Sequence, residues 1–429
     1  MGFLTTHTIT RTVTLEGFYL INRIKKIVES ASGKKDKRMV VDPIEFLSCL
    51  IFSFTGDAKV FSLESIRRTL IAESGSNISR SAFWERLISQ SLTKKLSESL
   101  NHIMNLINGQ SGLGHDLEKS LGVTGISMFD SSIVTLSNFA KEDFDSTFTE
   151  AGIKFHLESD GVSGGLRWSI LSSASVHDNC GFPNIQDQSG RLSIFDLGYF
   201  DWVRFANMDQ CGAFFLSRVK SNAAIRILEA VDGISAKHNG KLLKNLKFTR
   251  SRGTVVEFLT ERRINGEYHK FRVIGFWNKA QKRYHWYITN LNCSAKLISP
   301  LYRYRWQIEL LIKAAKQTLN MDQIPSSNRS IIINLSIARL IALGVAMVVK
   351  RVADINIQDA TLRGASSIQR AAKVLSILAS DFLFYIINTS RAATLKDKMY
   401  SLIHEMVDPN GKKRKTSFTA LRELASAIG

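Results

Sequence analysis

The chain of 429 residues exceeds one ordinary compact domain and suits two or three, at roughly 100–200 residues per domain. Hydrophobic residues make up 44% and charged residues 22%, with only 5 prolines, which excludes a fibrous or disordered chain. Its 57 Lys and Arg against 38 Asp and Glu leave a formal net charge of +19, so we expect a polyanionic partner, either nucleic acid or an anionic membrane surface.

Other global features narrow the location of the protein. The four cysteines are far apart and form no C-x-x-C pair, which predicts neither a zinc site nor a disulfide framework and fits a reducing cytoplasm. The first residues, Met1 to Thr6, lack the basic and apolar regions of a secretory signal. The stretch Ile331–Val349 is long and apolar enough to span a membrane, but Arg339 near its centre favours a helix buried inside the protein.

Residues 1–115 are predicted to be helical. They end in an amphipathic helix whose apolar stripe comprises Leu92, Leu96, Leu100, Ile103 and Ile107. Just before it, Ser79 is placed to cap a short helix that runs to Leu87. Two helices across a tight break are typical both of a helix-turn-helix that contacts DNA and of plain helical packing, and the sequence leaves both open. A basic cluster between Arg23 and Arg38 is either a solvated surface or a track for phosphates.

The glycine-rich segment Asn108–Gly125 is expected to be a linker that leads into a second region. This region alternates between strands and helix, which predicts a mixed α/β sheet. Strands are expected at residues 126–136, 154–157, 166–176, 192–195 and 213–217, with a helix after Asp196. Residues 218–287 are basic and rich in strands, with Asn265-Gly266 as a hairpin turn, and predict an inserted β-rich subdomain. Beyond Pro300 the chain is expected to be helical.

The segment that begins at Ser299 carries a row of polar side chains. Ser299 is a good N-cap and Pro300 suits the first helical position, so a helix is predicted to begin here. Helical spacing places the following polar residues on one face: Tyr302, Arg305, Glu309, Lys313 and Lys316. An acid among cations suits a site that cuts phosphodiester bonds, since the acid binds a metal and the cations hold phosphates. The same row is also typical of a solvated face with ion pairs between residues four apart.

Two further carboxylates follow apolar strands. Asp130 comes after Ile126–Phe129, and Asp196 comes after Leu192–Phe195. Ligands of α/β sheets gather at the ends of strands, although an aspartate there is often only a turn former or a helix cap. Together with Glu309, the two aspartates could hold a pair of magnesium or manganese ions, one beside the attacking oxygen and one beside the leaving oxygen.

These residues carry a resemblance to the insertion-sequence-4 family of DDE transposases. Tyr302, Arg305, Glu309 and Lys316 match its Y-(2)-R-(3)-E-(6)-K signature at every spacing. The segment Asp196–Phe200 is similar to the D-x-G-Y-F turn around the second aspartate of the family, with Leu197 where a basic residue is common. Ser131 and Ser132 after Asp130 depart from the more usual D-x-T pattern.

The resemblance implies a ribonuclease H-like catalytic core that a β-rich insertion interrupts. The core would comprise residues 120–217 and 288–350, the insertion residues 218–287, and the helical flanks residues 1–115, which would bind DNA, and 351–429. Asp130, Asp196 and Glu309 would be the catalytic metal ligands.

The resemblance also implies roles for residues around the three acids and a partner. Tyr302, Arg305 and Lys316 would contact DNA, and Lys313 is predicted to do so from its place on the same helix face. Either Trp277 or Trp286 would stack on a flipped base or belong to the core. The protein would act on element ends and target DNA in a bacterial cytoplasm, as a homodimer when two ends are paired.

Some alternatives remain open at this level. His177-Asp178 follows a predicted strand and suits a general base, but two-metal chemistry needs no histidine, which favours a structural role. Besides an active transposase, the sequence is compatible with an inactive DNA-binding derivative and with a metal-dependent nuclease on the same scaffold.

Overall fold

The computed structural model describes residues 15–35, 39–53, 62–108, 115–147, 149–220, 223–246, 255–357, 366–388, 391–408 and 423. Contacts within the chain divide it into two compact units. Unit 1 comprises residues 1–107, 136–140 and 310–414, and unit 2 comprises residues 108–135, 141–309 and 415–429. Unit 1 therefore contains both predicted helical flanks, and unit 2 contains the predicted insertion together with the first part of the core.

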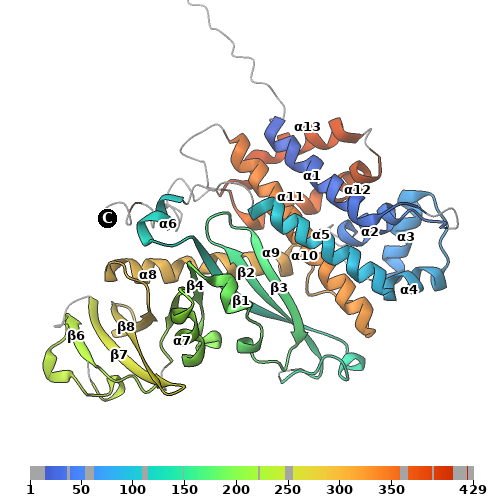
Figure 1. Ribbon diagram of the computed structural model, residues 1–429. Coiled ribbons are helices and arrows are strands. Elements are labelled where there is room, and N and C mark those ends of the chain that lie inside the picture. Colours follow the sequence, from blue (N-terminus) through green and yellow to red (C-terminus); the bar gives the residue numbers. More distant parts are fainter. Residues whose placement is uncertain are drawn as a thin grey trace, which may run out of the picture. The chain divides into compact units, whose positions relative to one another are not determined.

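Unit 2 is built on one mixed sheet, which confirms the predicted fold class. Its nine strands within the described residues lie in the order β3-β2-β1-β4-β5-β9-β8-β7-β6 (Figure 1). They are β1 (Gly125–Thr135), β2 (Gly152–Asp160), β3 (Leu166–Ser173), β4 (Arg191–Phe195), β5 (Phe214–Arg218), β6 (Glu229–Asp232), β7 (Val255–Ile264), β8 (Glu267–Asn278) and β9 (Arg283–Thr289).

The strands of the predicted insertion continue the sheet of the predicted core. β4 is parallel to β1 and β5 is parallel to β4, whereas β2 and β3 are antiparallel additions on the other side of β1. β9 pairs antiparallel with β5, so β6 to β9 extend the same sheet across that edge. The predicted hairpin turn is present between β7 and β8, where Asn265 and Gly266 both have positive φ, 50° and 92°.

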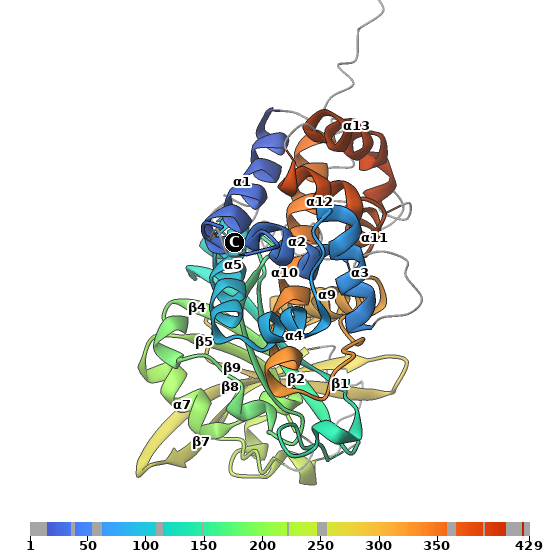
Figure 2. The ribbon, with the colours of Figure 1, turned by 90° about the vertical axis from the view of Figure 1, so that its right-hand side faces the viewer.

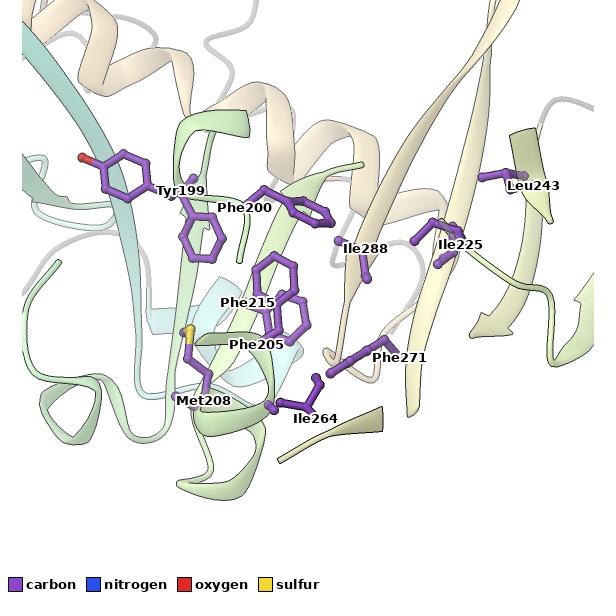
Figure 3. Close-up of a cluster of buried hydrophobic side chains, with 14 of the residues drawn as sticks. Tyr199, Phe200, Phe205, Met208, Phe215, Ile225, Leu243, Ile264, Phe271 and Ile288 are labelled. Carbon is purple, nitrogen blue, oxygen red and sulfur yellow. The ribbon is translucent and has the colours of Figure 1, made fainter. Parts of the chain in front are cut away.

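An aromatic cluster joins the two parts of this sheet. Phe205 and Phe215 stack with ring centroids 4.3 Å apart, and Phe271 of the insertion packs on Phe215 at 5.6 Å (Figure 3). Phe129 and Phe195, each directly before one of the predicted catalytic aspartates, are fully buried in the same cluster. Burial of large aromatic side chains is among the strongest stabilising contributions in a core, so the cluster fixes the strand ends that carry the aspartates.

Short helices accompany the sheet in unit 2, and one replaces an expected linker. They are α6 (His115–Leu121), α7 (Trp202–Gln210) and α8 (Ala295–Tyr304). The expectation of a linker over Asn108–Gly125 was wrong for α6, because Leu117 and Leu121 are buried one turn apart and Asp116 lies in the first turn, where a carboxylate favours a helix. Residues 109–114 of that segment lie outside the described residues.

The predicted helix start at Pro300 was also wrong. α8 begins at Ala295 after Ser294, with Pro300 inside it, and a second helix, α9 (Trp306–Gln317), follows after a break at Arg305. Buried Leu297 and Ile298 hold the turn before the proline, which explains why α8 starts early despite the missing N–H group.

Unit 1 is helical, as expected for both flanks. Its helices are α1 (Leu15–Ser32), α2 (Pro43–Phe52), α3 (Leu63–Ser74), α4 (Arg80–Ile88), α5 (Gln90–Asn108), α10 (Arg329–Asn356), α11 (Ile368–Ile377), α12 (Ala379–Ile387) and α13 (Ala392–Leu402). α1 packs against α2, α10 and α12, so the beginning and the end of the chain share one helical core (Figure 2). The chain also contains a run of four basic residues, Lys412-Lys413-Arg414-Lys415, which lies outside the described residues.

Helix α10 has the length and hydropathy of a membrane span, yet 94% of its most apolar window is buried inside the protein. Arg339 is 1% exposed and donates to the carbonyl oxygens of Asn320 and Gln323 at 3.0 and 2.5 Å. This agrees with the predicted buried helix, because the arginine finds its hydrogen-bond partners within the protein.

The helix pair α4 and α5 has the predicted cap and apolar stripe. Ser79 accepts a hydrogen bond from Ala82 N at 3.2 Å, and the five apolar residues of the α5 stripe are all buried. Ser89 alone separates the two helices, which is shorter than the turn of three or four residues that is typical of a helix-turn-helix. The geometry favours helical packing for this pair.

Candidate active site

The register of two parallel strands brings the two predicted aspartates together. Phe129 of β1 pairs with Phe195 of β4, so the next residues on the two strands, Asp130 and Asp196, are neighbours. β4 ends at Phe195, whereas β1 continues to Thr135, which places Asp130 within its strand and not at the expected end. The carboxyl end of β4 therefore presents both carboxylates on one edge of the sheet.

Glu309 reaches the same place through Arg305. The Arg305 guanidinium donates from Nη1 to Asp130 Oδ2 at 3.3 Å and from Nη2 to Glu309 Oε1. Arg305 lies at the break between α8 and α9, so both helices determine its position. Glu309 follows one turn later on α9. Two of the three predicted acids thus share one cation, which joins α9 to β1.

Burial and repulsion act on the charges of this site. Burial raises the pKa of Asp130 to about 6, and Asp196 and Glu309 add to this rise, while Arg305 and the backbone N–H of Ser131 oppose it. Burial alone would lower the pKa of Arg305, but Tyr302, Asp130 and Glu309 raise it above its ordinary value. The negative charges of the acids therefore interact, and a cation between them reduces their repulsion.

A fourth carboxylate lies beside these residues and was not assigned to the site from the sequence. Asp178, in the 3₁₀ turn η2 (Asp178–Cys180), accepts hydrogen bonds on Oδ1 from Ser131 Oγ at 2.8 Å and from Lys154 Nζ at 3.2 Å. Ser131 is the residue directly after Asp130, and Ser132 stands where the family pattern has threonine. In the sequence, Asp178 was visible only as part of a polar pair, His177-Asp178, after a predicted strand. Its hydrogen-bond partners Lys154 and Ser131 are 24 and 47 residues away in the chain, so no local pattern reveals them.

His177, the residue before Asp178, has a structural role, which the sequence favoured over that of a general base. His177 caps the η2 turn, and its Nδ1 accepts a hydrogen bond from Asn179 N at 3.2 Å. The bond fixes the turn in which Asp178 stands.

The remaining residues of the predicted polar row lie on both sides of the helix break. Tyr302 is half-buried on α8, with its ring against Tyr287 of β9 at 5.1 Å and the Arg305 guanidinium 5.7 Å from its centroid. Lys313 is exposed on α9, and Lys316 is half-buried there, where burial lowers its pKa. On another side of α9, Ile308, Leu311 and Ala315 are buried, whereas Trp306 at its start is exposed.

Both tryptophans that were considered for base stacking make aromatic contacts within the insertion. Trp277 packs on Tyr284 at 5.2 Å, and Trp286 packs on Phe258 at 5.8 Å. Trp286 lies across from Gly275, where a Cβ would stand 2.5 Å from the indole, so the glycine makes room for the ring. Both side chains are half-buried, and a role in base stacking stays a prediction.

The donor set fits divalent metal ions by its chemistry. Carboxylate oxygens are the ligands that magnesium and manganese prefer, and a buried group of acids gains most from a cation. Within the described residues, no three His, Cys, Asp or Glu side chains are close enough together to hold one ion. The guanidinium of Arg305 lies between Asp130 and Glu309, so metal binding by all three acids requires Arg305 to move from this position.

Comparisons with known proteins agree on one class. Residues 123–344, slightly more than half of the chain, match the model of a family described as the transposase DDE domain. A curated protein of Sinorhizobium fredii named "Putative transposase y4zB" is 26% identical over 197 residues, which make up 41% of this chain and 48% of that protein. The chain spans about half the length of this relative.

Among solved structures, the piggyBac transposase in a synaptic complex with hairpin DNA is similar over 96% of this chain and 84% of its own. The TM-score is 0.44 and the sequence identity 13%.

Proposed function

The chain belongs to the transposase DDE domain family, and on this premise we propose that it is a DNA transposase that cuts and joins phosphodiester bonds at the ends of a mobile element. The observation that supports the proposal is that the β1–β4 register makes Asp130 and Asp196 neighbours, and that Arg305 forms ion pairs with both Asp130 and Glu309. The Y-(2)-R-(3)-E-(6)-K spacing supports assignment to the insertion-sequence-4 branch of the family.

In this proposal the three acids would hold two magnesium or manganese ions. Such ions, when bound, lower the pKa of an attacking water and stabilise the leaving oxygen of an in-line displacement. The chain itself supplies the position of the DNA strand. Tyr302 and Arg305 lie directly beside the acids, and we assign them to the terminal phosphate, which the planar guanidinium can hold with two hydrogen bonds.

Lys313 and Lys316 continue the row along α9 and are assigned to the phosphates that follow. The helical flank 1–115 is assigned to binding of the element ends, and pairing of two ends would require a homodimer. The strong positive charge of the chain supports the assignment of DNA as its partner, because it favours a polyanion over neutral partners.

The test is cleavage of DNA that carries the cognate inverted repeats, with magnesium present. We expect wild-type protein to nick at the repeat ends and to join pre-nicked ends to target DNA. Glu309→Gln should reduce nicking by about a thousandfold or more, because a proposed metal ligand is lost. DNA binding should be retained, because the net charge of the protein stays strongly positive. Glu142→Gln, an exposed acid of the same unit, is the matched control and should behave as wild type.

Other outcomes separate the alternatives. Binding without metal-dependent nicking by the wild type would indicate an inactive derivative. Nicking without strand transfer would indicate a nuclease on this scaffold, and nicking that survives Glu309→Gln would contradict the assignment of the site.

A further inference from the structure

Asp178 is held as a metal-binding carboxylate is usually held. Its Oδ1 accepts both the Ser131 hydroxyl and the Lys154 ammonium, and Lys154 is itself buried and donates to Val176 O at 2.5 Å. These bonds fix the plane of the carboxylate and leave Oδ2 without a hydrogen-bond partner among the described residues. In metal sites, hydrogen bonds to one carboxylate oxygen commonly orient the other toward the ion.

The direction of Oδ2 follows from Gly198. A Cβ at residue 198 would lie 2.6 Å from Asp178 Oδ2 and 3.1 Å from Asp196 Oδ1. The backbone N–H of Gly198 donates to Asp196 Oδ1 at 2.8 Å. The two carboxylates therefore face the same small space, and glycine is required there because any side chain would push Asp178 away.

A buried hydroxyl points to a ligand in this space. Tyr199 is 1% exposed, and its hydroxyl has no hydrogen-bond partner among the described residues. Figure 3 shows this hydroxyl turned away from the aromatic cluster that holds the ring. After burial itself, the charges of Asp178, Asp130 and Asp196 are the main causes that raise the Tyr199 pKa, so the hydroxyl lies among these acids. A buried donor without a partner is unfavourable, and an acceptor such as a water molecule bound in this space would remove that cost.

One arginine joins the two turns that carry these groups. Arg204 of α7 donates to Asn179 Oδ1 and Asn179 O, at 2.9 and 2.6 Å, and to Tyr199 O at 2.9 Å. Asn179 follows Asp178 in η2, and Tyr199 ends the turn η4 (Leu197–Tyr199) that Asp196 caps. The spacing of Asp178 and Asp196 is thus set by a buried guanidinium.

We propose that Asp178 is a fourth carboxylate of the active site, that its Oδ2 binds a divalent cation together with Asp196, and that the Tyr199 hydroxyl donates a hydrogen bond to a water molecule bound with this cation. The inference rests on the proposed function, because it concerns the same site. It adds a ligand that comes from the loop after β3, outside the triad of acids that the sequence predicts.

The experiment measures manganese binding to the purified full-length protein without DNA. Isothermal titration calorimetry gives the affinity, and electron paramagnetic resonance reports binding as the loss of the free-ion spectrum. Asp178→Asn keeps the size of the side chain and an acceptor for Ser131 and Lys154, and should weaken manganese binding about tenfold to a hundredfold. Asp187→Asn changes an exposed aspartate of the next turn, η3 (Ile185–Gln188), and should bind as wild type.

A second variant tests the position without removing a charge. Gly198→Ala introduces a methyl group 2.6 Å from Asp178 Oδ2, and it should reproduce the loss seen for Asp178→Asn. The melting temperature in EDTA reports folding separately for each variant. Wild-type manganese affinity in both folded variants would overturn the proposal, as would an effect of Asp178→Asn that Gly198→Ala does not share.

The two proposals fail in different ways. If Asp196→Asn and Glu309→Gln also bind manganese as the wild type does, the proposed function loses its metal site. If those two variants lose the ion while Asp178→Asn and Gly198→Ala retain it, the triad stands and only the fourth carboxylate is wrong.

Discussion

At the scale of single residues, Arg305 has two successive roles in our account. It lies between Asp130 and Glu309, two acids that repel each other in a partly buried place, and it supplies the positive charge that makes their proximity tolerable. A guanidinium keeps its charge under all physiological conditions, so this compensation does not depend on pH. Bound metal would replace that charge and release the guanidinium for a phosphate.

Replacement of Arg305 tests this exchange. Arg305→Met should lower the free energy of unfolding in EDTA by about 2–4 kcal/mol, because two facing carboxylates lose their cation. Manganese should restore more stability to this variant than to the wild type, since the ion then has no guanidinium to displace. Urea denaturation with and without manganese measures both effects.

The control for this variant is Arg303→Met, an exposed arginine two residues earlier on α8. It should change stability little under either condition. An Arg305→Met protein that manganese stabilises no more than the wild type would show that the guanidinium and the ion do not compete for one place.

The residues of the site differ in how well the sequence could predict them. The spacing from Tyr302 to Lys316 is local, so its pattern is visible in the sequence without knowledge of the fold. Asp178 has no such local signal, because the features that make it part of the site come from Ser131, Lys154 and Gly198. Long-range register creates that neighbourhood, and a single sequence does not contain it.

At the scale of elements, two short turns and one helix hold the acids in place. Arg204 is 8% exposed on α7, makes three hydrogen bonds to η2 and η4, and lies 4.5 Å from the centroid of Phe182. Loss of a buried donor leaves carbonyl oxygens without partners, which costs more than the net value of the bonds. α7 is therefore part of the site even though none of its side chains touches the predicted triad.

Arg204→Met should lower the free energy of unfolding by about 2–4 kcal/mol and should also weaken manganese binding, because the turns that carry Asp178 and Asp196 are no longer joined. Urea denaturation and manganese titration at a temperature where the variant is folded provide the two measurements. Arg226→Met is a suitable control, because Arg226 is an exposed arginine of the same unit whose side chain donates to Gly240 O. Full manganese affinity in folded Arg204→Met protein would contradict the positioning role.

The errors at this scale have a common physical cause. A Ser-Pro pair is a good start signal, but the buried residues Leu297 and Ile298 extended α8 past it, and tertiary packing overrode the local preference. The glycine-rich segment before β1 concealed α6 for the same reason, since Leu117 and Leu121 are buried. Strands were predicted more accurately, because their alternation reflects which face is covered.

At the scale of the whole molecule, the sheet and the units could be predicted only in part. The alternation of strands gave the mixed α/β class, and the match to the transposase DDE domain family agrees with it over residues 123–344. The inserted strands extend the sheet because β5 pairs with β9. The paired residues are about seventy positions apart in the chain, and composition does not reveal such a pairing. The joint core of α1 with α10 and α12 depends on contacts that are still more distant in the chain.

The net charge of +19 leads to the last prediction, which concerns DNA binding as a function of salt. Each phosphate that the protein neutralises releases counterions, so the logarithm of the binding constant should fall linearly with the logarithm of salt concentration, by about 0.9 per contact. Lys313→Met should reduce this slope by about one unit, because Lys313 is exposed on the proposed DNA-binding face of α9. Lys373→Met, an exposed lysine of α11, is the matched control and should leave the slope unchanged.

Fluorescence anisotropy with labelled element ends, in EDTA and at several salt concentrations, measures the slopes without cleavage. Glu309→Gln should bind at least as tightly as the wild type, because it removes a negative charge beside the phosphates, and should keep the full slope. A slope that Lys313→Met and Lys373→Met lower equally would mean that the charge acts as a diffuse field. Binding that requires metal even in Glu309→Gln would instead show that the ions, and not the basic surface, hold the DNA.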